Sequence, residues 1–410
     1  NATGQGPDST NTCVNAGAGA GVGANSSNAG AGGAGHGGAG GSGTTQGGGS
    51  QFDSATAPAF FGSGGGSQGS APGGRGGGMV RLNVSGTFTH NGAITANASN
   101  GTVGGTNAGG GGSGGSIYVT ASTVNGTTGT FAATGGDGAD SGASNPDANG
   151  EGGGGAGGRI AVVYNTGTFT FDTSDFDVAP GVGPDAAADG GRGTVFVNDN
   201  QATASTADDA VQVFHGFTFA DADYNVASWT ADPAATGQTC DPAMGTNATP
   251  SIQASGNVTL AGTLSCSPSI ASWNVIAAGS VTFSNAASIT VNGDSTVSAG
   301  TTFSMGTGVS YTISKTNSDL EFNIPAGNSQ TWDSLTVTIA VEGEFIVDDA
   351  VAVTMTNGAT VNGSARWTAL TSLTMDSGTT INASVKGCGI VVNATGQGPD
   401  STNTCVNAGA

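Results

Sequence analysis

The sequence predicts an all-β protein built as a parallel β-solenoid with Gly-rich loops, tandemly repeated. Of its 410 residues 78 are Gly, and only 9% are charged, so little material exists for amphipathic helices. Short alternating segments broken by Gly, Asn, Asp and Ser are typical of half-buried strands. Residues 1–18 and 393–410 are the same sequence, NATGQGPDSTNTCVNAGA, which we call the terminal repeat. Repetition at a fixed period is typical of stacked architectures.

The terminal repeat implies a period of 392 residues, from 1 to 393. The chain begins with Asn and shows no signal peptide, so we expect it to be a window from a longer polypeptide. Helix-rich folds, coiled coils and doubly wound α/β folds are excluded by the scarcity of helix formers. No run approaches the roughly 18 consecutive apolar residues of a membrane span, so none is predicted.

A Gly-rich β-helix module is predicted over residues 1–198. Four segments there share a Gly cluster followed by an alternating strand, with equivalent positions at Met79, Ile117, Ile160 and Val195, separated by 38, 43 and 35 residues. GCGIVVNATG, from Gly387, begins the pattern again, so the module should continue from about residue 387 of the preceding repeat. Tracts such as 16–43 are either flexible linkers or closely packed extended segments that only residues without Cβ allow. The recurring strands favour ordered loops tethered to a solenoid.

The second half is drier and more regular. We predict a transition segment over 199–250, a regular β-solenoid module over 251–386 and the start of the next repeat over 387–410. About three short strands with their turns would form a coil of roughly 20–25 residues. The four Trp are interpreted as core or corner anchors, with a sugar-stacking platform as the alternative. A hairpin-joined β-sandwich is the competing architecture.

The five Cys reduce to four in one period, because Cys405 repeats Cys13. An even count permits two disulfides with three pairings. Proximity in sequence favours Cys240 with Cys266 and Cys388 with Cys405, where Cys13 would pair with the Cys388 equivalent of the preceding repeat. Four free thiols are the alternative. Disulfides would place the protein in an oxidising, extracellular compartment.

The net charge of −21 predicts no nucleic-acid partner, because nothing neutralises phosphates. No cofactor is required by the sequence, although hard oxygen ligands for Ca²⁺ cluster in two loops. The alternative is that these carboxylates are simply solvated. The candidate calcium ligands are Asp137, Asp140, Asp147, Glu151, Asp172, Asp175, Asp177, Asp185 and Asp189. Several N-x-S/T sequons permit surface glycosylation: Asn83, Asn97, Asn100, Asn125 and Asn382.

No catalytic site is predicted. A pectinase-like set would stack acidic residues and a His on successive coils, but Asp199, Asp208–Asp209 and His215 are too close in sequence to do so. His36, His90 and His215 are isolated and have no metal-ligand spacing. The T-x-T pairs that an ice-binding array needs occur only sporadically.

The combination GGSGGSIYVTAS, GGDGAD, GGGGAGGRIAVVY and GGRGTVFV resembles the Gly-rich parallel β-helix repeats of giant secreted bacterial surface proteins, over roughly residues 74–200. This resemblance implies a right-handed parallel β-helix in an adhesin-like or fibre-forming protein and supplies no catalytic residues. We expect a structural repeat unit of an extracellular or cell-surface filament, whose partners are identical neighbouring units. The alternative is an adhesin stalk that binds glycans through its lateral face.

Overall fold

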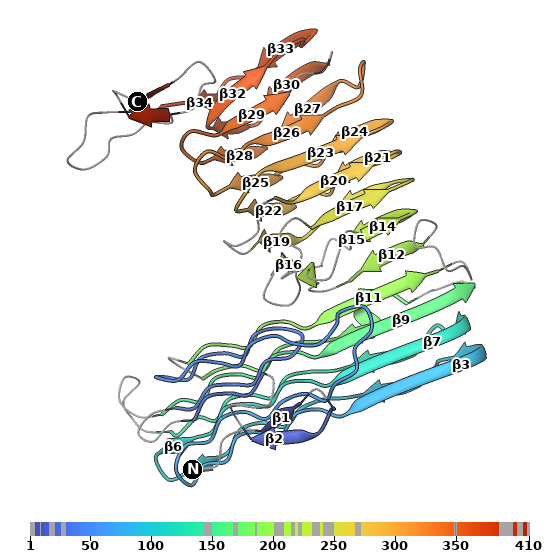
Figure 1. Ribbon diagram of the computed structural model, residues 1–410, viewed down its shortest axis with the longest axis vertical. Coiled ribbons are helices and arrows are strands. Elements are labelled where there is room, and N and C mark those ends of the chain that lie inside the picture. Colours follow the sequence, from blue (N-terminus) through green and yellow to red (C-terminus); the bar gives the residue numbers. More distant parts are fainter. Residues whose placement is uncertain are drawn as a thin grey trace. The chain divides into compact units, whose positions relative to one another are not determined.

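The computed structural model shows a protein built from β-strands (Figure 1). It describes residues 5–399 and 405–407, apart from 9, 16–20, 26–29, 143–149, 167–170, 185–186, 201–208, 215–217, 220–223, 232–237, 241–249, 267–271, 348, 350 and 385–396. Within this part of the chain the one helical element is a 3₁₀ turn, η1, Thr173–Asp175. The chain divides into an N-terminal unit, Asn1–Thr218 with Ala234–Gln238, and a C-terminal unit, Phe219–Pro233 with Thr239–Ala410.

The main sheet of the N-terminal unit contains four parallel strands, one after each Gly cluster. They are β3 (Met79–Thr89), β7 (Ser116–Asn125), β9 (Arg159–Thr166) and β11 (Thr194–Asp199). Val80, Ile117, Ile160 and Val195 pair across them. The predicted equivalence of Met79 with Ile117 is therefore wrong by one residue, because Met79 pairs with Ser116. The last strand of this unit's main sheet, β12 (Ala210–Val213), runs antiparallel to β11.

A second parallel sheet, β4 (Ala93–Thr95), β8 (Thr130–Ala132) and β10 (Phe176–Asp177), accompanies the first three strands. Alternating side chains of both sheets form one apolar core that includes Ile117, Val119 and Phe131, as expected for strands with one buried face. Short antiparallel pairs complete the unit: β1 (Gln5–Pro7) with β2 (Cys13–Asn15), and β5 (Val103–Gly104) with β6 (Asn107–Ala108).

The C-terminal unit consists of parallel sheets in which each strand pairs with the third strand along the chain. One sheet contains β14 (Tyr224–Val226), β17 (Ser251–Ala254), β20 (Asn274–Ala277), β23 (Ser295–Ala299), β26 (Leu320–Asn323), β29 (Glu344–Val347) and β32 (Ser364–Trp367). The next contains β19 (Thr263–Cys266), β22 (Ser288–Val291), β25 (Ser310–Ile313), β28 (Thr336–Ile339), β31 (Thr360–Asn362) and β34 (Thr380–Asn382). Short strands β13 (Thr218–Phe219) and β16 (Gln238–Cys240) precede β19 in the order of this sheet.

The remaining strands of this unit form two further parallel sets. They are β15 (Ser228–Ala231), β18 (Val258–Leu260), β21 (Ser280–Phe283) and β24 (Thr302–Met305), then β27 (Gln330–Asp333), β30 (Ala352–Thr356) and β33 (Ser372–Met375). Along the sheet of β19–β34, Leu264 pairs with Ile289, then Tyr311, Val337, Val361 and Ile381. The spacing of these partners along the chain is close to the predicted coil. Parallel pairing rules out a hairpin-joined β-sandwich.

Alternation along each short strand creates the C-terminal unit's core. Trp229, Trp273 and Trp332 are fully buried, which confirms that these three are core anchors and not sugar platforms. Aromatic rings from different sheets contact one another, as in Phe303 of β24 with Phe322 of β26, whose ring centroids are 5.1 Å apart. Such contacts add to the apolar area that this core buries.

Candidate functional site

The Gly-rich tracts of the N-terminal unit form a closely packed bundle of extended segments. Successive amides of residues 31–36 point to three different neighbours in strict rotation. Residues 31 and 34 donate to carbonyls 108 and 111, residues 32 and 35 to 24 and 21, and residues 33 and 36 to 41 and 38. A period of three is that of a polyproline-II-type helix. The segment also accepts hydrogen bonds from residues 49–52, 66 and 153–156, so it has six neighbours. We call this arrangement the glycine lattice.

The glycine lattice exists because its members lack side chains. A Cβ on Gly32 would lie 2.0 Å from the carbonyl oxygen of Gly47, and one on Gly33 would lie 2.0 Å from that of Gly154. Residues 30–38 are all buried, and their backbone groups find partners in other segments, as buried polar groups require. Of the interpretations left open by the sequence, close packing is therefore confirmed for the described tracts, and the flexible linker is wrong for them.

Four polar side chains pin the glycine lattice to the main sheet. The Nδ1 of His36 lies 2.7 Å from the carbonyl oxygen of Gly114, and its Nε2 lies 3.2 Å from Oδ2 of Asp53. The hydroxyl of Ser116, at the start of β7, donates to the same Oδ2 at 3.2 Å. Arg159, at the start of β9, donates from Nε to the carbonyl of Phe52 at 2.9 Å. We call these four residues the buried anchor.

Charge in the buried anchor is stabilised by its hydrogen bonds. Burial alone would raise the pKa of Asp53, but the hydrogen bond and charge of His36 and the amides of Ser54 and Ala59 outweigh it, so the pKa is lowered. Ser, His and Asp side chains in contact resemble a hydrolase triad in composition. His36 and Ser116 are 0% exposed, however, so no substrate reaches them, and we assign them a structural role. Sequence reasoning missed this anchor, although a lone His in a Gly tract was a signal.

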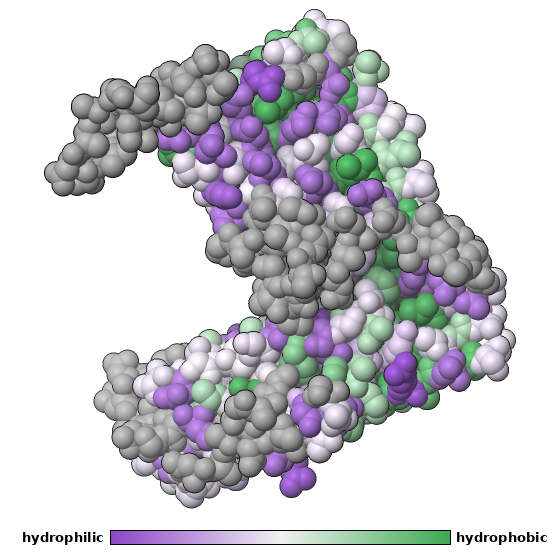
Figure 2. All heavy atoms as spheres, viewed as in Figure 1, coloured by the Kyte–Doolittle hydropathy of each residue, from purple (hydrophilic) through white to green (hydrophobic). Residues whose placement is uncertain are grey.

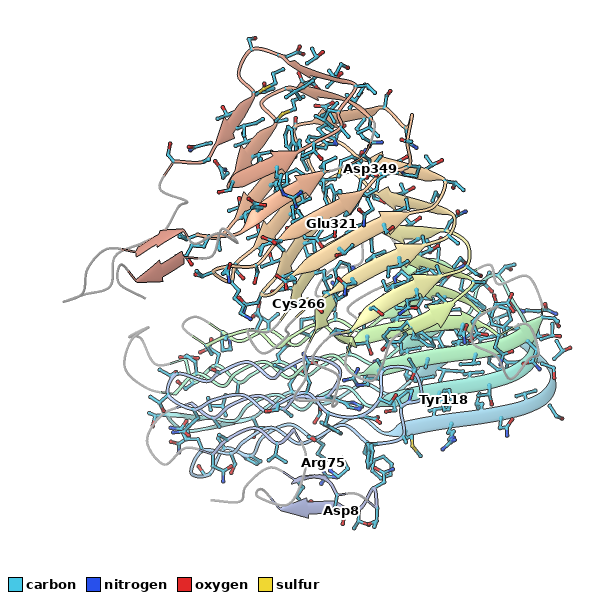
Figure 3. All side chains as sticks on the ribbon, turned by 45° about the horizontal axis from the view of Figure 1, so that its top comes forward. Asp8, Arg75, Tyr118, Cys266, Glu321 and Asp349 are labelled. Carbon is cyan, nitrogen blue, oxygen red and sulfur yellow. The ribbon has the colours of Figure 1, made fainter. Side chains whose placement is uncertain are left out.

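β3 forms the edge of the main sheet (Figure 1), and the core is incomplete beneath it. Val80, Leu82 and Val84 of β3 are half-buried, whereas their partners on β7, Ile117 and Val119, are 0% exposed. On the outer face the guanidinium of Arg81 lies 5.3 Å from the ring centre of Tyr118, which is labelled in Figure 3. Among the described strands β3 is paired on one side only, and an edge strand with incompletely buried apolar residues is a template for pairing with another strand.

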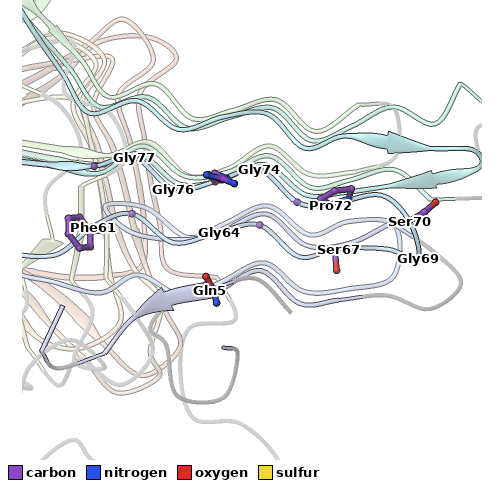
Figure 4. A pocket seen from close by; sticks show the side chains of 15 residues that line it. Gln5, Phe61, Gly64, Ser67, Gly69, Ser70, Pro72, Gly74, Gly76 and Gly77 are labelled. Atoms are coloured by element: carbon purple, nitrogen blue, oxygen red, sulfur yellow. The ribbon is translucent and has the colours of Figure 1, made fainter. Parts of the chain in front are cut away.

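An open groove of the glycine lattice continues this edge toward the first hairpin, β1–β2. Two extended segments form its walls, and Gly65 and Gly62 of one donate to the carbonyls of Gly74 and Gly77 in the other (Figure 4). The amides of Gly73 and Gly76, three residues apart, make no hydrogen bond with any residue that the structure describes. The lattice is therefore open where its next segment would lie. We call β3 and this groove together the open edge.

The first copy of the terminal repeat docks beside the open edge. The amide of Gly64 donates to the carbonyl of Gln5 at 2.7 Å, and that of Phe61 donates to Oδ1 of Asn11 at 3.0 Å. Asp8 holds the hairpin turn by accepting from the amides of Thr10 and Thr12 (Figure 3). The hydroxyl of Thr10 also donates to Asp8. This bond most of all, together with those from the two amides, lowers the pKa of the Asp8 carboxyl. The second copy forms the same antiparallel pair, β35 (Gln397–Pro399) with β36 (Cys405–Asn407), in the same register.

Of the predicted disulfide residues, Cys266 is buried at the end of β19 and is disulfide-bonded. Its partner must be sought among the other cysteines, whose side chains all lie outside the described residues: Cys13, Cys240, Cys388 and Cys405. Cys240 ends β16, the strand next to β19 in the sheet order. Adjacent strands have the Cα separation that a disulfide needs. The pairings themselves stay predictions.

The candidate calcium ligands serve the loops in which they lie. Asp137 accepts from the amide of Val182, Asp140 from that of Gly142, and Asp177 from that of Ala179. Asp172 and Asp175 form a capping box on η1, where the hydroxyl and amide of Ser174 lower the pKa of Asp172. Asp189 accepts from the amide of Gly183, and Glu151 is buried. Asp147 and Asp185 lie outside the described residues. Among the residues that are described, no three His, Cys, Asp or Glu side chains gather as a metal site.

The remaining candidates divide by exposure. The five sequon residues Asn83, Asn97, Asn100, Asn125 and Asn382 are all exposed, so their glycosylation is sterically open. Asp199 ends β11, and the buried Asp209 accepts from the side-chain amide of Asn198 at 2.7 Å. Asp208 and His215 lie outside the described residues.

No family model matches this chain, and no curated protein or solved structure is significantly similar to it. The resemblance to giant surface proteins therefore stays an expectation. Among the described residues no helix has the length and apolar character needed to cross a membrane.

Proposed function

We propose that this chain is a structural repeat unit of an extracellular or cell-surface filament, built by head-to-tail stacking of β-solenoid units. The observation that carries the proposal is the open edge, where a parallel sheet, its core layer and the glycine lattice end beside the β1–β2 hairpin, with no further strand of the sheet among the described residues. In repeat architectures such a surface is covered by the next repeat or by a capping repeat. A contact between two different surfaces that does not close into a ring propagates as a filament.

The winding of the C-terminal unit supports the same proposal. Consecutive strands of this unit belong to different sheets in turn. In the β19–β34 sheet, pairing is in register over six strands. Each coil therefore presents to the next the same apolar column and the same row of backbone groups, which is the stacking principle of a β-solenoid. In line with the resemblance described above, we propose a right-handed parallel β-helix.

An extracellular location is supported by the disulfide at Cys266, because such bonds persist in oxidising compartments. We propose Cys240–Cys266 within the repeat and Cys388–Cys405 at the junction. Peptide mapping without reduction should recover both cross-linked pairs. Alkylation of all four thiols of one period without prior reduction would contradict the proposal.

Electron microscopy of the native or reassembled material tests the filament. At about 4.8 Å per coil, the 13 or 14 coils that we estimate from about 20–25 residues per regular coil and about five Gly-rich coils give an axial repeat of about 60–70 Å. Thin, one-start fibres with that repeat are expected. A repeat well above about 100 Å would mean extended linkers between separate domains.

The alternative function, an adhesin stalk that binds glycans through its lateral face, is favoured by one observation. Outward-facing Ser and Thr of the β19–β34 sheet form two columns, because the register brings them together although T-x-T is sporadic in sequence. The hydroxyls of Ser288, Thr290, Ser310, Thr312, Thr336 and Thr338 make no hydrogen bond within the described chain. Figure 2 shows further hydrophilic side chains over this unit. Saturable binding to one sugar class on a glycan array would favour this function.

A further inference from the structure

A column of four Gly residues precedes the strands of the N-terminal unit's main sheet. A Cβ on Gly115 would lie 1.8 Å from the carbonyl oxygen of Gly78. A Cβ on Gly158 or Gly193 would lie 2.1 Å from the carbonyl of the column residue one strand earlier. A Cβ on Gly78, in contrast, would meet nothing within 4 Å. Within this column the close approach that requires Gly at the other three positions is missing at β3, which has no strand on its outer side among the described residues.

The sequence contains one further segment with the pattern that forms this sheet. Within GCGIVVN, which starts at Gly387, the last four residues IVVN resemble VFVN of β11 when the Val-Asn pairs that end both segments are aligned, and this alignment places Cys388 opposite Gly193. In β11 the inward residues are Val195 and Val197, which then align with Ile390 and Val392. This segment directly precedes the second copy of the terminal repeat, whose first copy docks beside the open edge.

We infer that residues Gly387–Val392 of a second copy of this chain bind the open edge as the next parallel strand. Ile390 and Val392 then cover the half-buried Val80 and Leu82, and Gly387–Gly389 lies along the end of the Gly tract that precedes β3, next to Gly76. The inference rests on the proposed function, because it names the contact through which repeats stack. It is a case of strand addition, in which backbone pairing supplies affinity and alternate side chains supply specificity.

Chain continuity places the segment next to the docked hairpin in sequence. Val392 is followed directly by a terminal repeat, which corresponds to Asn1 onward, so its position lies five residues before Gln5. Five residues span at most about 18 Å. Gln5 itself lines the groove, and Nδ2 of Asn11 lies 3.8 Å from Sδ of Met79, the first residue of β3. Between separate molecules, the terminal repeat of the incoming copy takes the place of the first copy, which it matches in sequence.

The hydrogen-bond pattern between β3 and β7 shows which backbone groups of β3 are available to this strand. The amide of Ser116 donates to the carbonyl of Gly78 at 3.1 Å. In a parallel ladder alternate residues face the same neighbour, so Val80 and Leu82 face β7, whereas Met79, Arg81 and Asn83 present their amides to the open edge. Proline at 81 removes one of these amides without removing a bond of the existing sheet, which is the position an edge strand tolerates.

The test compares full-length Arg81→Pro with Arg81→Ala, because both lose the contact with Tyr118 and only the first loses the amide. Filament length is measured by electron microscopy and sedimentation. A labelled peptide of residues Lys386–Asn393, with Cys388→Ser, measures docking by fluorescence anisotropy. We expect Arg81→Ala to assemble and bind the peptide like wild type. We expect Arg81→Pro to lose filaments and to bind the peptide about tenfold more weakly, equivalent to about 1.4 kcal/mol.

A second pair of variants tests the incoming segment. Ile390→Asp should abolish assembly, because it places a charge on the apolar column, whereas Val391→Asp on the opposite face should assemble. Loss of assembly with Val391→Asp but not with Ile390→Asp would show that the assignment of Ile390 to the inward face and Val391 to the outward face is wrong. Circular dichroism of the monomers checks that all four variants fold.

The outcomes separate the docking contact from the filament function. Filaments that persist in both Arg81→Pro and Ile390→Asp would overturn the docking contact and leave the filament standing. If the wild-type chain forms no filaments but binds the peptide, and Arg81→Pro weakens that binding, the docking contact is supported and the filament function is overturned. Absence of both filaments and peptide binding would overturn both.

Discussion

At the scale of single residues, this protein holds charged side chains among Gly-rich segments, which offer few side chains to pair with them. Asp53 and Arg159 are embedded among Gly segments, and each charge is satisfied by backbone groups as well as side chains. An unpaired buried charge would cost several kcal/mol. The buried anchor therefore stabilises the unit only as a complete set, and removal of one member leaves the others unsatisfied.

Asp53→Asn tests this dependence. The amide nitrogen cannot accept the bonds that Oδ2 receives from the amides of Ala59 and Phe60, so we expect a loss of about 1–3 kcal/mol in the free energy of unfolding at pH 7. The pKa of Asp53 is lowered from 3.8 in the fold, so its contribution is present above that value and is lost as the pH falls below it. Denaturant titrations at pH 7 and pH 3 should show the difference shrinking. An equal difference at both pH values would contradict the charge effect.

A second prediction concerns the glycine lattice. Gly33→Ala places a Cβ against the backbone of Gly154, which is not free to move aside, and should cost about 1–3 kcal/mol or more. Gly47→Ala is the matched control, because a Cβ there meets nothing within 4 Å. It should be neutral or stabilise by about 0.4–1 kcal/mol. Equal thermal midpoints for the two variants would show that the lattice is not close-packed.

At the scale of elements, Asn and Asp side chains at or just outside the ends of strands bond to backbone amides one parallel-strand spacing further along the chain. Asn257, Asn274 and Asn285 accept from backbone amides 22 or 23 residues ahead. Asp294 and Asp319 do so 25 residues ahead. The sequence indicated turns at Gly, Asn, Asp and Ser in general, but these bonds depend on the spacing of paired strands along the chain and could not be read locally. They supply a polar counterpart to the apolar columns of the strands.

The acidic turn residues also repel one another. Burial, followed by the charges of Asp294 and Glu344, outweighs the amide of Glu344 and raises the pKa of Asp319. Because the pKa is raised in the fold, ionisation of Asp319 destabilises the fold fully above the raised pKa, and the penalty disappears only below the ordinary value of 3.8. Asp319→Asn keeps the acceptor for the amide of Glu344 and should raise the thermal midpoint at pH 7 but not at pH 3. A lower midpoint at pH 7 would show that the charge is needed.

At the scale of the whole molecule, assembly must overcome the repulsion between copies of this chain, each with a net charge of −21. Between about 10 mM and 150 mM salt the Debye length falls from about 30 Å to about 8 Å. We therefore expect filaments to form faster and at lower protein concentration as salt is raised, with light scattering as the measurement. Sodium and potassium chloride should act alike if screening is the cause. Faster assembly at low salt would point instead to a charge-paired contact.

Local pattern determined much of this architecture. The scarcity of helix formers, the alternation of short strands and the Gly cluster before each long strand predicted parallel strands with a spacing close to that observed. The same signals placed Trp229, Trp273 and Trp332 in the core. These properties follow from side-chain periodicity and backbone freedom, which act over a few residues and are therefore visible in the sequence.

The sequence alone determined that this chain is built of repeating β-strands and that residues 1–18 recur at 393–410, whereas the antiparallel pair within each copy came from the structure. Only the tertiary structure decided that the Gly tracts form a six-neighbour lattice, that His36, Asp53, Ser116 and Arg159 meet, that β12 reverses direction and that β3 is left as an edge. Each of these depends on contacts between residues far apart in the sequence. Glycine carries no side chain to mark its partners, so its packing is specified by the neighbours that the rest of the fold brings to it.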